Sequence, residues 1–401
     1  MVSHFLLLSG FLSCGMNQPV ETPVVLEIKK GKLQRLIPWQ TYPADLPAPD
    51  TTYADCYALT PLADAHVHLA LDGVDFAAAR ARWNDETGMH HMWQTNLEAM
   101  ARAGVLAARD GGDRQGWAHR LAAQMDSLFY IHTTHPAYCR EGGYGTAFAH
   151  PLGRNAMPPW GELTTQIRAN GSRHLKLMLS GIISFTEYGQ VGPCQFTEKE
   201  LSALVAQANG AGLPLMVHAS GAEASALAAS CGVHSLEHGY FLTESTLTIL
   251  AQKGIYWVPT LAPVAAHAPA YPVAARSLDR QMQMVELARQ LGVPVVAGSD
   301  AGATGVRHGF GLLKELELLG QCGYSPLELL TKVLRHTWQS LNPDLDPVWP
   351  LPALNLYRQP PWQKLSALSA DLITILWLGD DEIARTTLAK SHLKFSPASS
   401  D

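Results

Sequence analysis

Short apolar runs bounded by turn residues recur along the chain, and runs of this kind are typical of buried β-strands. The length of each run matches a strand better than a helix, which needs ten residues or more. We predict eight strands, which cover residues 57–63, 104–109, 128–132, 174–179, 213–219, 234–238, 255–260 and 294–300.

Helix signals lie between the predicted strands. Thr197 and Glu200 form the pattern of a capping box, and apolar residues follow at helical spacing up to Gly212. Further helices are predicted at residues 244–253 and 277–291, and each is closed by a glycine. The repeated alternation of strand and helix predicts an α/β fold, a parallel (β/α)8 TIM barrel.

Side chains that can bind metals stand at the carboxyl ends of several predicted strands. His66 and His68 are two residues apart, so their side chains leave a strand on the same side. Further candidates at later strand ends are Lys176, His218, His238 and Asp300. Functional side chains of a barrel lie at this end of its strands, and imidazole and carboxylate groups bind divalent metals. The pattern therefore predicts a metal site there.

Around these six residues the sequence resembles the amidohydrolase superfamily, in the branch whose strand-four lysine carries a carbamate. More narrowly, it is similar to the prolidase-like, imidazolonepropionase-related dipeptidases. The resemblance extends over about residues 5–340, with a fainter echo at residues 369–375. It rests on the motifs at residues 105–112, 175–181, 217–221, 235–239 and 298–302.

The resemblance implies a small β-sandwich domain built from both ends of the chain. An apolar stretch at residues 5–14 would open it, and residues 24–28 and 33–37 have the pattern of a hairpin around Gly31. We expect three segments: residues 1–58 as the N-terminal part of the β-domain, residues 59–341 as the barrel, and residues 342–401 as a linker, reaching to residue 364, with the C-terminal part of the β-domain.

The resemblance also implies a binuclear site. The ligands would be His66, His68 and Asp300 for one divalent metal, and His218 and His238 for the other. A carbamate on Lys176 and a hydroxide would bridge the metals, about 3.5 Å apart. Asp300 would accept the proton of the hydroxide and pass it to the departing amine. Zinc is expected by default, although manganese, cobalt or iron suit the same ligands. Two plainer readings stay open: an ordinary ion-paired Lys176, and Asp300 as a helix cap.

Polar residues in the predicted loops could bind a substrate carboxylate, which arginine can hold with two hydrogen bonds. The candidates are Arg140, Tyr144, Tyr188, Arg307 and His308. They could equally be ordinary surface-loop residues. Relatives commonly have a histidine where this chain has Tyr144, so their substrates cannot be carried over directly. Arg109 is expected in a structural ion pair at the barrel rim.

Three functions are compatible with these residues. The first is hydrolysis of a C–N bond, in an amide or peptide such as a dipeptide or an N-acyl amino acid. The second is a mononuclear deaminase, or a lactone or phosphoester hydrolase, on the same scaffold. Deaminases usually lack the strand-four lysine and carry an acid soon after the strand-five histidine, for which Glu223 is a loose candidate. The third is a non-catalytic scaffold, which would have lost ligands that this chain keeps.

Composition fits a single enzyme with a small-molecule substrate. The chain has 401 residues, of which 47% are hydrophobic and 16% are charged, enough for one large barrel and an appendage. Its net charge of −6 and the lack of a long basic run argue against nucleic acid as a partner. No stretch reaches the roughly 18 apolar residues of a membrane span. Six scattered cysteines favour reduced thiols in the cytoplasm. A homo-oligomer is left open.

Overall fold

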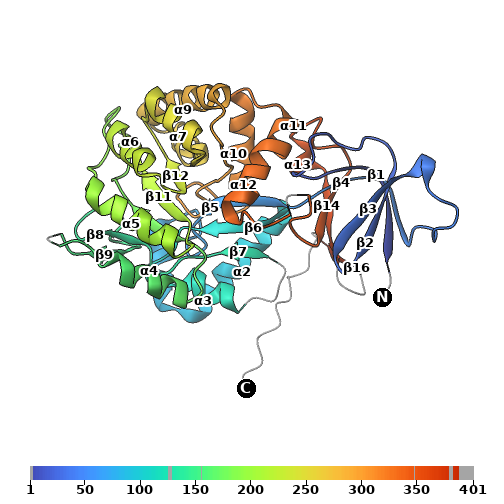
Figure 1. Cartoon of the computed structure of the whole chain (residues 1–401), viewed down its shortest axis with the longest axis horizontal. Coiled ribbons are helices and arrows are strands. Elements are labelled where there is room, and N and C mark those ends of the chain that lie inside the picture. Colours follow the sequence, from blue (N-terminus) through green and yellow to red (C-terminus); the bar gives the residue numbers. More distant parts are fainter. Residues whose placement is uncertain (1–2, 125–128, 155, 347, 379–382, 388–401) are drawn as a thin grey trace, which may run out of the picture.

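The computed structural model describes residues 3–124, 129–154, 156–346, 348–378 and 383–387. A seven-stranded sheet lies at one end of the molecule, beside a larger part in which helices surround parallel strands (Figure 1). Within the described residues, no helix combines the length and the apolar character that a membrane span requires. The six cysteines all lie in the described part of the chain, and Cys139, Cys194, Cys231 and Cys322 are free thiols.

Strands from both ends of the chain form the seven-stranded sheet. Its order is β16-β15-β14-β4-β1-β2-β3, with β1 His4–Leu12, β2 Val24–Lys29, β3 Lys32–Pro38, β4 Thr51–Leu59, β14 Ala353–Tyr357, β15 Leu372–Leu378 and β16 Ile383–Thr387. The predicted hairpin is confirmed, because β2 and β3 pair in antiparallel register. The strands form one sheet, so the expected sandwich of two sheets is not confirmed. The expected linker at 342–364 also contains β14, which pairs with β4.

The parallel strands of the larger part lie in two sheets. The first sheet holds β5 Leu62–Val67, β6 Val105–Asp110 and β7 Tyr130–His132. The second has the order β13-β12-β11-β10-β8-β9, with β8 Tyr138–Arg140, β9 His150–Leu152, β10 Leu175–Met178, β11 Leu215–Ala219, β12 Ser235–His238 and β13 Tyr256–Val258. Single bridges from Trp257 to Val295 and from Val67 to Ala301 connect the two sheets.

The described strands therefore do not close into one continuous eight-stranded sheet, which is where the structure differs from the predicted barrel. The eighth predicted strand, residues 294–300, is not assigned as a strand. It contacts its neighbours through an isolated bridge between Val295 and Trp257 and through single backbone hydrogen bonds, such as that from the Ala65 N–H to the Ala297 carbonyl. The first predicted strand is divided at Pro61: residues up to Leu59 belong to β4 in the terminal sheet, and β5 begins at Leu62. Residue 128 of the third predicted strand lies outside the described residues.

Helices cover the outside of the parallel strands. The predicted capping box is present at α5, Glu198–Gly210, and α7 spans the predicted residues Glu244–Lys253. Helix α9, Pro272–Leu291, begins five residues earlier than predicted, because Pro272 fits the first turn of a helix. The others are α1 Phe76–Ala81, α2 Glu86–Arg102, α3 Trp117–Ala123, α4 Trp160–Ala169, α6 Ala222–Cys231, α8 Leu261–His267, α10 Phe310–Gln321, α11 Pro326–Glu328, α12 Leu334–Leu341 and α13 Ala367–Ala370.

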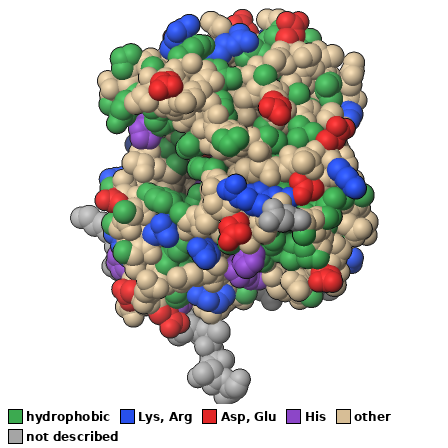
Figure 2. All heavy atoms as spheres, turned by 90° about the vertical axis from the view of Figure 1, so that its left-hand side faces the viewer, with side chains coloured by type: hydrophobic (Ala, Val, Ile, Leu, Met, Phe, Trp, Pro, Cys, Tyr) green, Lys and Arg blue, Asp and Glu red, His purple; other side chains and the backbone are tan. Residues whose placement is uncertain are grey.

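Short helical turns of other types complete the chain. Two 3₁₀ turns lie at Trp39–Thr41 and Arg82–Asn84, and a π-helical turn at Leu329–Val333 leads into α12. The buried face of the helices packs with the strands into one large apolar core. The face of the molecule farthest from the seven-stranded sheet contains a hollow bordered by hydrophobic side chains (Figure 2).

Candidate metal centre and active site

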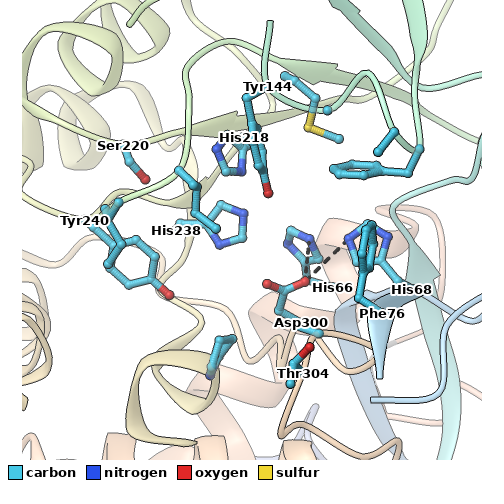
Figure 3. Close-up of a pocket in the computed structure, with 18 of the residues that line it drawn as sticks. His66, His68, Phe76, Tyr144, His218, Ser220, His238, Tyr240, Asp300 and Thr304 are labelled. Carbon is cyan, nitrogen blue, oxygen red and sulfur yellow. Dashed lines mark ion pairs between the residues drawn. The ribbon is translucent and has the colours of Figure 1, made fainter. Parts of the chain in front are cut away.

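Six predicted side chains converge on one cavity of about 610 Å³. The four histidines and Asp300 are labelled in Figure 3. Four of the six side chains belong to strands, one directly follows the end of β5, and one ends the segment 294–300, which is not an assigned strand. They are His66 in β5, Lys176 in β10, His218 in β11 and His238 in β12, together with His68 and Asp300. Parallel strands bring their carboxyl ends to the same edge, which explains why residues so far apart in sequence meet.

The Asp300 carboxylate joins the two histidines of the first strand. Its Oδ1 lies 3.5 Å from His66 Nε2 and 3.5 Å from His68 Nε2. Lys176 Nζ lies 3.5 Å from the same His66 nitrogen. The ring of His238 lies 4.9 Å from that of His66 and 4.5 Å from that of His218. The six groups thus form one cluster.

Three of these groups are already close enough to share a metal ion. Ligand atoms of His66, His238 and Asp300 all lie within 4.8 Å of one another. This set combines residues that the sequence assigned to two different metals. The donors are imidazole nitrogens and a carboxylate oxygen, which suit zinc and its neighbours among the transition metals.

Two of the six residues have a backbone conformation that is rare for side chains other than glycine. His238 has φ 66° and Asp300 has φ 54°. On a regular strand, Glu237 and His238 would point to opposite faces, yet both side chains contact the interior cluster. The left-handed backbone at His238 turns its ring back into the cavity. Such strain of roughly 1–3 kcal/mol per residue persists mainly at functional sites.

Two glycines make room for His68. A β-carbon on Gly111 would lie 2.5 Å from His68 Cε1, and one on Gly302 would lie 2.5 Å from the His68 carbonyl oxygen. Gly302 also has φ 102°, which other residues rarely adopt. Close approach to His68 is therefore the physical reason for Gly111 in the motif at residues 105–112 and for Gly302 in the motif at residues 298–302.

The buried carboxylate of Glu237 is hydrogen-bonded to one histidine of the cluster. Glu237 Oε2 accepts a hydrogen bond from His66 Nδ1 at 2.8 Å, and Glu237 Oε1 pairs with Arg109 Nη2 at 2.9 Å. Arg109 and Glu237 are 1% and 0% exposed. Arg109 thus forms the expected ion pair, but in the protein interior and not at a rim. Because the bond to Glu237 occupies Nδ1, Nε2 of His66 faces the cavity.

Sequence reasoning missed Glu237 and the partner of His238. His238 Nδ1 lies 2.7 Å from Thr260 Oγ1, at the end of the next strand, and His218 Nε2 lies 3.3 Å from the Gly181 carbonyl oxygen. A signal for Glu237 was available: an acidic residue beside a ligand histidine, in a strand that is otherwise buried, needs a charged partner.

Burial dominates the electrostatics of the cluster. Desolvation lowers the pKa of His68 and of His218 to about 3, so both rings are neutral at pH 7. Neutral imidazole is the form that binds metals. Desolvation also lowers the pKa of Lys176 to about 8 and raises the pKa of Asp300 to about 7. The Lys176 ammonium and the Asp300 carboxylate each moderate the shift of the other.

The predicted loop residues divide into one that lines the cavity and four that do not. Tyr144 is buried against His218, with ring centroids 5.0 Å apart, and its hydroxyl points into the cavity (Figure 3). Arg140 is turned the other way. It pairs with Glu200, donates to the Gly153 carbonyl at 2.6 Å and lies 4.4 Å over the Phe196 ring. The start of α5 therefore occupies Arg140, and its expected role at the substrate is corrected.

The other three candidates also lie outside the cavity wall. Tyr188 packs beneath the guanidinium of Arg276, at 3.7 Å from the ring centroid. Arg307 is exposed and borders a separate surface depression. His308 is 1% exposed and does not line the cavity. Loop conformation, which depends on tertiary packing, decides these positions.

Two alternative interpretations can be compared with the structure. Glu223, the loose candidate for a deaminase acid, is an exposed residue of the first turn of α6. Asp300 does not begin a helix, because the next helix, α10, starts at Phe310 with Gly309 as its cap. Neither residue supports the alternative that the sequence left open.

Comparison with known proteins agrees with this geometry. Residues 59–338 match the model of the Amidohydrolase family, so the chain belongs to that family. Membership supports a hydrolase that acts on C–N bonds. A protein of Mycobacterium bovis, named Uncharacterized protein Mb2939c, is 28% identical over 332 residues, which are 79% of this chain and 80% of that protein.

Solved structures share the fold at low sequence identity. The crystal structure of a Xaa-Pro dipeptidase with bound methionine superposes with a TM-score of 0.79 at 19% identity, covering 96% of this chain and 100% of the other. The crystal structure of A. niger ochratoxinase superposes with a TM-score of 0.77 at 15% identity, covering 94% of this chain and 95% of the other.

Proposed function

We propose that this chain is a binuclear metal-dependent amidohydrolase that cleaves a C–N bond of a small molecule. The observation that carries the proposal is the convergence of six metal-competent side chains on one cavity. Of these, His66, His68 and Asp300 would hold one divalent cation, and His218 and His238 the other. A carboxylated Lys176 would contact both. Zinc remains the default metal for such imidazole-rich ligands.

The donor set fits two cations if Lys176 carries a carbamate. With an unmodified lysine, the six side chains supply one carboxylate, from Asp300, and one amine that is an ammonium when protonated. Two divalent cations next to an ammonium would repel it. Reaction of the neutral amine with carbon dioxide replaces that positive charge with a negative one. Burial favours this step, because it lowers the pKa of Lys176 to about 8.

The side chains of the chain itself account for proton transfer and orientation. Bound divalent cations supply an activated water and polarise the scissile carbonyl. Asp300 lies beside both His66 and His68, where its carboxylate can accept a proton from the attacking water and return it to the departing amine. Burial raises the pKa of the Tyr144 hydroxyl, so it stays protonated and can donate a hydrogen bond to the carbonyl oxygen.

Similar proteins suggest substrate classes without deciding among them. The structural neighbours include a Xaa-Pro dipeptidase and an ochratoxinase. Dipeptides and N-acyl amino acids are therefore the first compounds to test. A mononuclear deaminase, or a lactone or phosphoester hydrolase, remains the second candidate on this fold, although the exposed position of Glu223 argues against a deaminase.

Metal analysis of the purified protein tests the proposal. We expect two equivalents of divalent metal per chain, loss of amide hydrolysis after chelation, and recovery when metal is restored. Lys176→Ala should lose the second metal, whereas a short carboxylic acid added to this variant should restore part of the activity. One metal bound beside an unmodified lysine would contradict the proposal. Turnover of lactones or phosphoesters without turnover of any amide would also contradict it.

Two further proposals concern the setting of the enzyme. A reducing cytoplasm suits six cysteines that are scattered along the sequence and form no Cys-x-x-Cys pair. A homo-oligomer is the second proposal. It is not required for turnover of a small molecule, and light scattering on the metal-loaded protein measures the oligomeric state.

A further inference from the structure

We propose that the substrate is an uncharged amide with apolar groups, not a dipeptide or N-acyl amino acid with a free carboxylate. The inference rests on the proposed amidohydrolase function and narrows its substrate class. The inference follows from the apolar side chains that line the cavity and from the position of Arg140 and Arg307 outside it.

The cavity wall is apolar outside the metal-competent cluster. Among the described residues that line it, Lys176 and Asp300 are the only lysine, arginine, aspartate or glutamate side chains, and both belong to the cluster. The remaining wall is formed largely by Leu71, Phe76, Phe148, Met178, Ile182 and Phe185. A volume of about 610 Å³ is in the range of pockets for drug-sized ligands.

Aromatic rings are arranged along one side of this wall. The Phe148 ring lies 5.9 Å from that of His68 and 6.4 Å from that of Phe76, in edge-to-face contact with both. The apolar character continues to the mouth, where Ile182 is 52% exposed. Ile182 therefore extends the apolar wall to the cavity mouth, where an apolar group of a ligand can contact it.

No arginine among the described residues lines the cavity, where a substrate carboxylate would need one. In a dipeptide the carboxylate lies on the leaving-group side, one carbon beyond the scissile nitrogen, so its counter-charge must come from the wall. Arg140 is held by Glu200 and the Gly153 carbonyl, and Arg307 lies on the outer surface. The polar groups that remain on the wall include the neutral hydroxyls of Tyr144, Ser220 and Thr304 (Figure 3). Burying a carboxylate without a cation is strongly unfavourable.

One basic side chain on the wall could compete with this interpretation. His267, at the end of α8, lines the cavity, and its ring lies 4.7 Å from Phe185 and 6.2 Å from Tyr271. Packed against these two aromatic rings, the imidazole ring extends the apolar surface of the wall. The variant His267→Leu distinguishes an apolar wall residue from a carboxylate-binding residue. If His267 belongs to the apolar wall, the preference for neutral substrates should stay unchanged. If it binds a carboxylate, the replacement should make acids worse substrates.

The test uses pairs of amides that differ only in charge. Metal-loaded protein is assayed with 4-methylacetanilide against 4-acetamidobenzoate, and with N-acetylphenylalanine amide against N-acetylphenylalanine. We expect kcat/KM to be at least about tenfold higher for the neutral member of each pair. Equilibrium binding of the same pairs is measured by calorimetry, so that a pair without turnover still gives a result.

A new cation at the mouth provides the reciprocal test. Ile182→Arg should raise kcat/KM for the acids at least about tenfold and lower it for the neutral amides. Met157→Arg is the matched control, because Met157 is an exposed methionine, at 44%, that does not line the cavity; it should change neither series.

The outcomes distinguish failure of the proposed substrate class from failure of the proposed amidohydrolase function. Equal or better turnover or binding of the acids would overturn the substrate class while leaving the amidohydrolase function in place. A two-metal protein that cleaves lactones or phosphotriesters and binds no amide would overturn the amidohydrolase function and the substrate class together.

Discussion

Glu237→Gln should weaken metal binding although Glu237 is not itself a ligand. The wild-type carboxylate accepts a hydrogen bond from His66 Nδ1 at 2.8 Å and pairs with Arg109 at 2.9 Å. Glutamine has nearly the same shape but carries no charge, so its carbonyl is a weaker acceptor for the His66 ring. The ring loses orientation and basicity, and its cavity-facing nitrogen becomes a poorer ligand.

Two magnitudes follow from these contacts. Removal of a carboxylate behind a ligand histidine costs about 10- to 100-fold in metal affinity, or about 1.4–2.8 kcal/mol. In the same variant, the guanidinium of Arg109, which is 1% exposed, loses its counter-charge. An uncompensated buried charge costs about 3–5 kcal/mol in the free energy of unfolding.

A double variant separates metal binding from stability. Arg109→Met combined with Glu237→Gln removes both buried charges, and such replacements are often neutral for stability. We therefore expect the free energy of unfolding to recover in the double variant, whereas metal affinity stays reduced because His66 still lacks its carboxylate. The matched control is Glu27→Gln with Arg35→Met, which removes a pair whose arginine is 51% exposed. It should cost at most about 1 kcal/mol and leave metal affinity unchanged.

The assays are denaturant unfolding of the metal-free protein and metal titration against a competing chelator. If the Glu237→Gln variant binds metal within twofold of the wild type, Glu237 does not position His66. If the double variant is as unstable as Glu237→Gln alone, the instability does not come from the unpaired arginine.

Three other predictions concern catalysis and pH. Asp300→Asn should lower kcat at least about a hundredfold while much of the metal stays bound; near-normal turnover in the metal-loaded variant would exclude a proton-transfer role. Tyr144→Phe should lower kcat at least about tenfold with little change in metal content, as checked by metal analysis beside steady-state kinetics; an unchanged kcat would mean that the hydroxyl does not contact the carbonyl oxygen. Burial raises the pKa of Glu315 from 4.5 to about 8, so the folded state prefers the protonated acid and stability should fall as pH rises from about 4.5 to about 8, by at most about 5 kcal/mol for this group. Unfolding of the metal-loaded protein across that range should show a shallower slope for Glu315→Gln, and parallel slopes would refute the assignment.

Several features of the fold and site were readable from sequence because they depend on local pattern. The capping box of Thr197 and Glu200 and the helix at Glu244–Lys253 are set by residues within one or two turns. The positions of the metal-competent side chains were also predictable. Each follows an apolar run, and the carboxyl ends of parallel strands share one edge.

Contacts between distant segments determine several side-chain positions that the sequence alone did not predict. The sequence predicted Arg109 at the rim, whereas the structure buries it. Only the assembled strands bring Glu237 to His66, which lies 171 residues earlier. Arg140 is turned away from the cavity because the start of α5 presents Glu200 to it, and a loop residue has no periodicity from which this direction could be inferred.

By itself, the sequence determined the α/β alternation and the set of side chains that can bind metal, because hydrophobic periodicity and residue chemistry are properties of short segments. The tertiary structure decided the single terminal sheet, the left-handed turn that aims His238 inward, and the apolar cavity wall around the cluster. These features arise from contacts between segments distant in sequence, and such contacts exist only once the chain has folded.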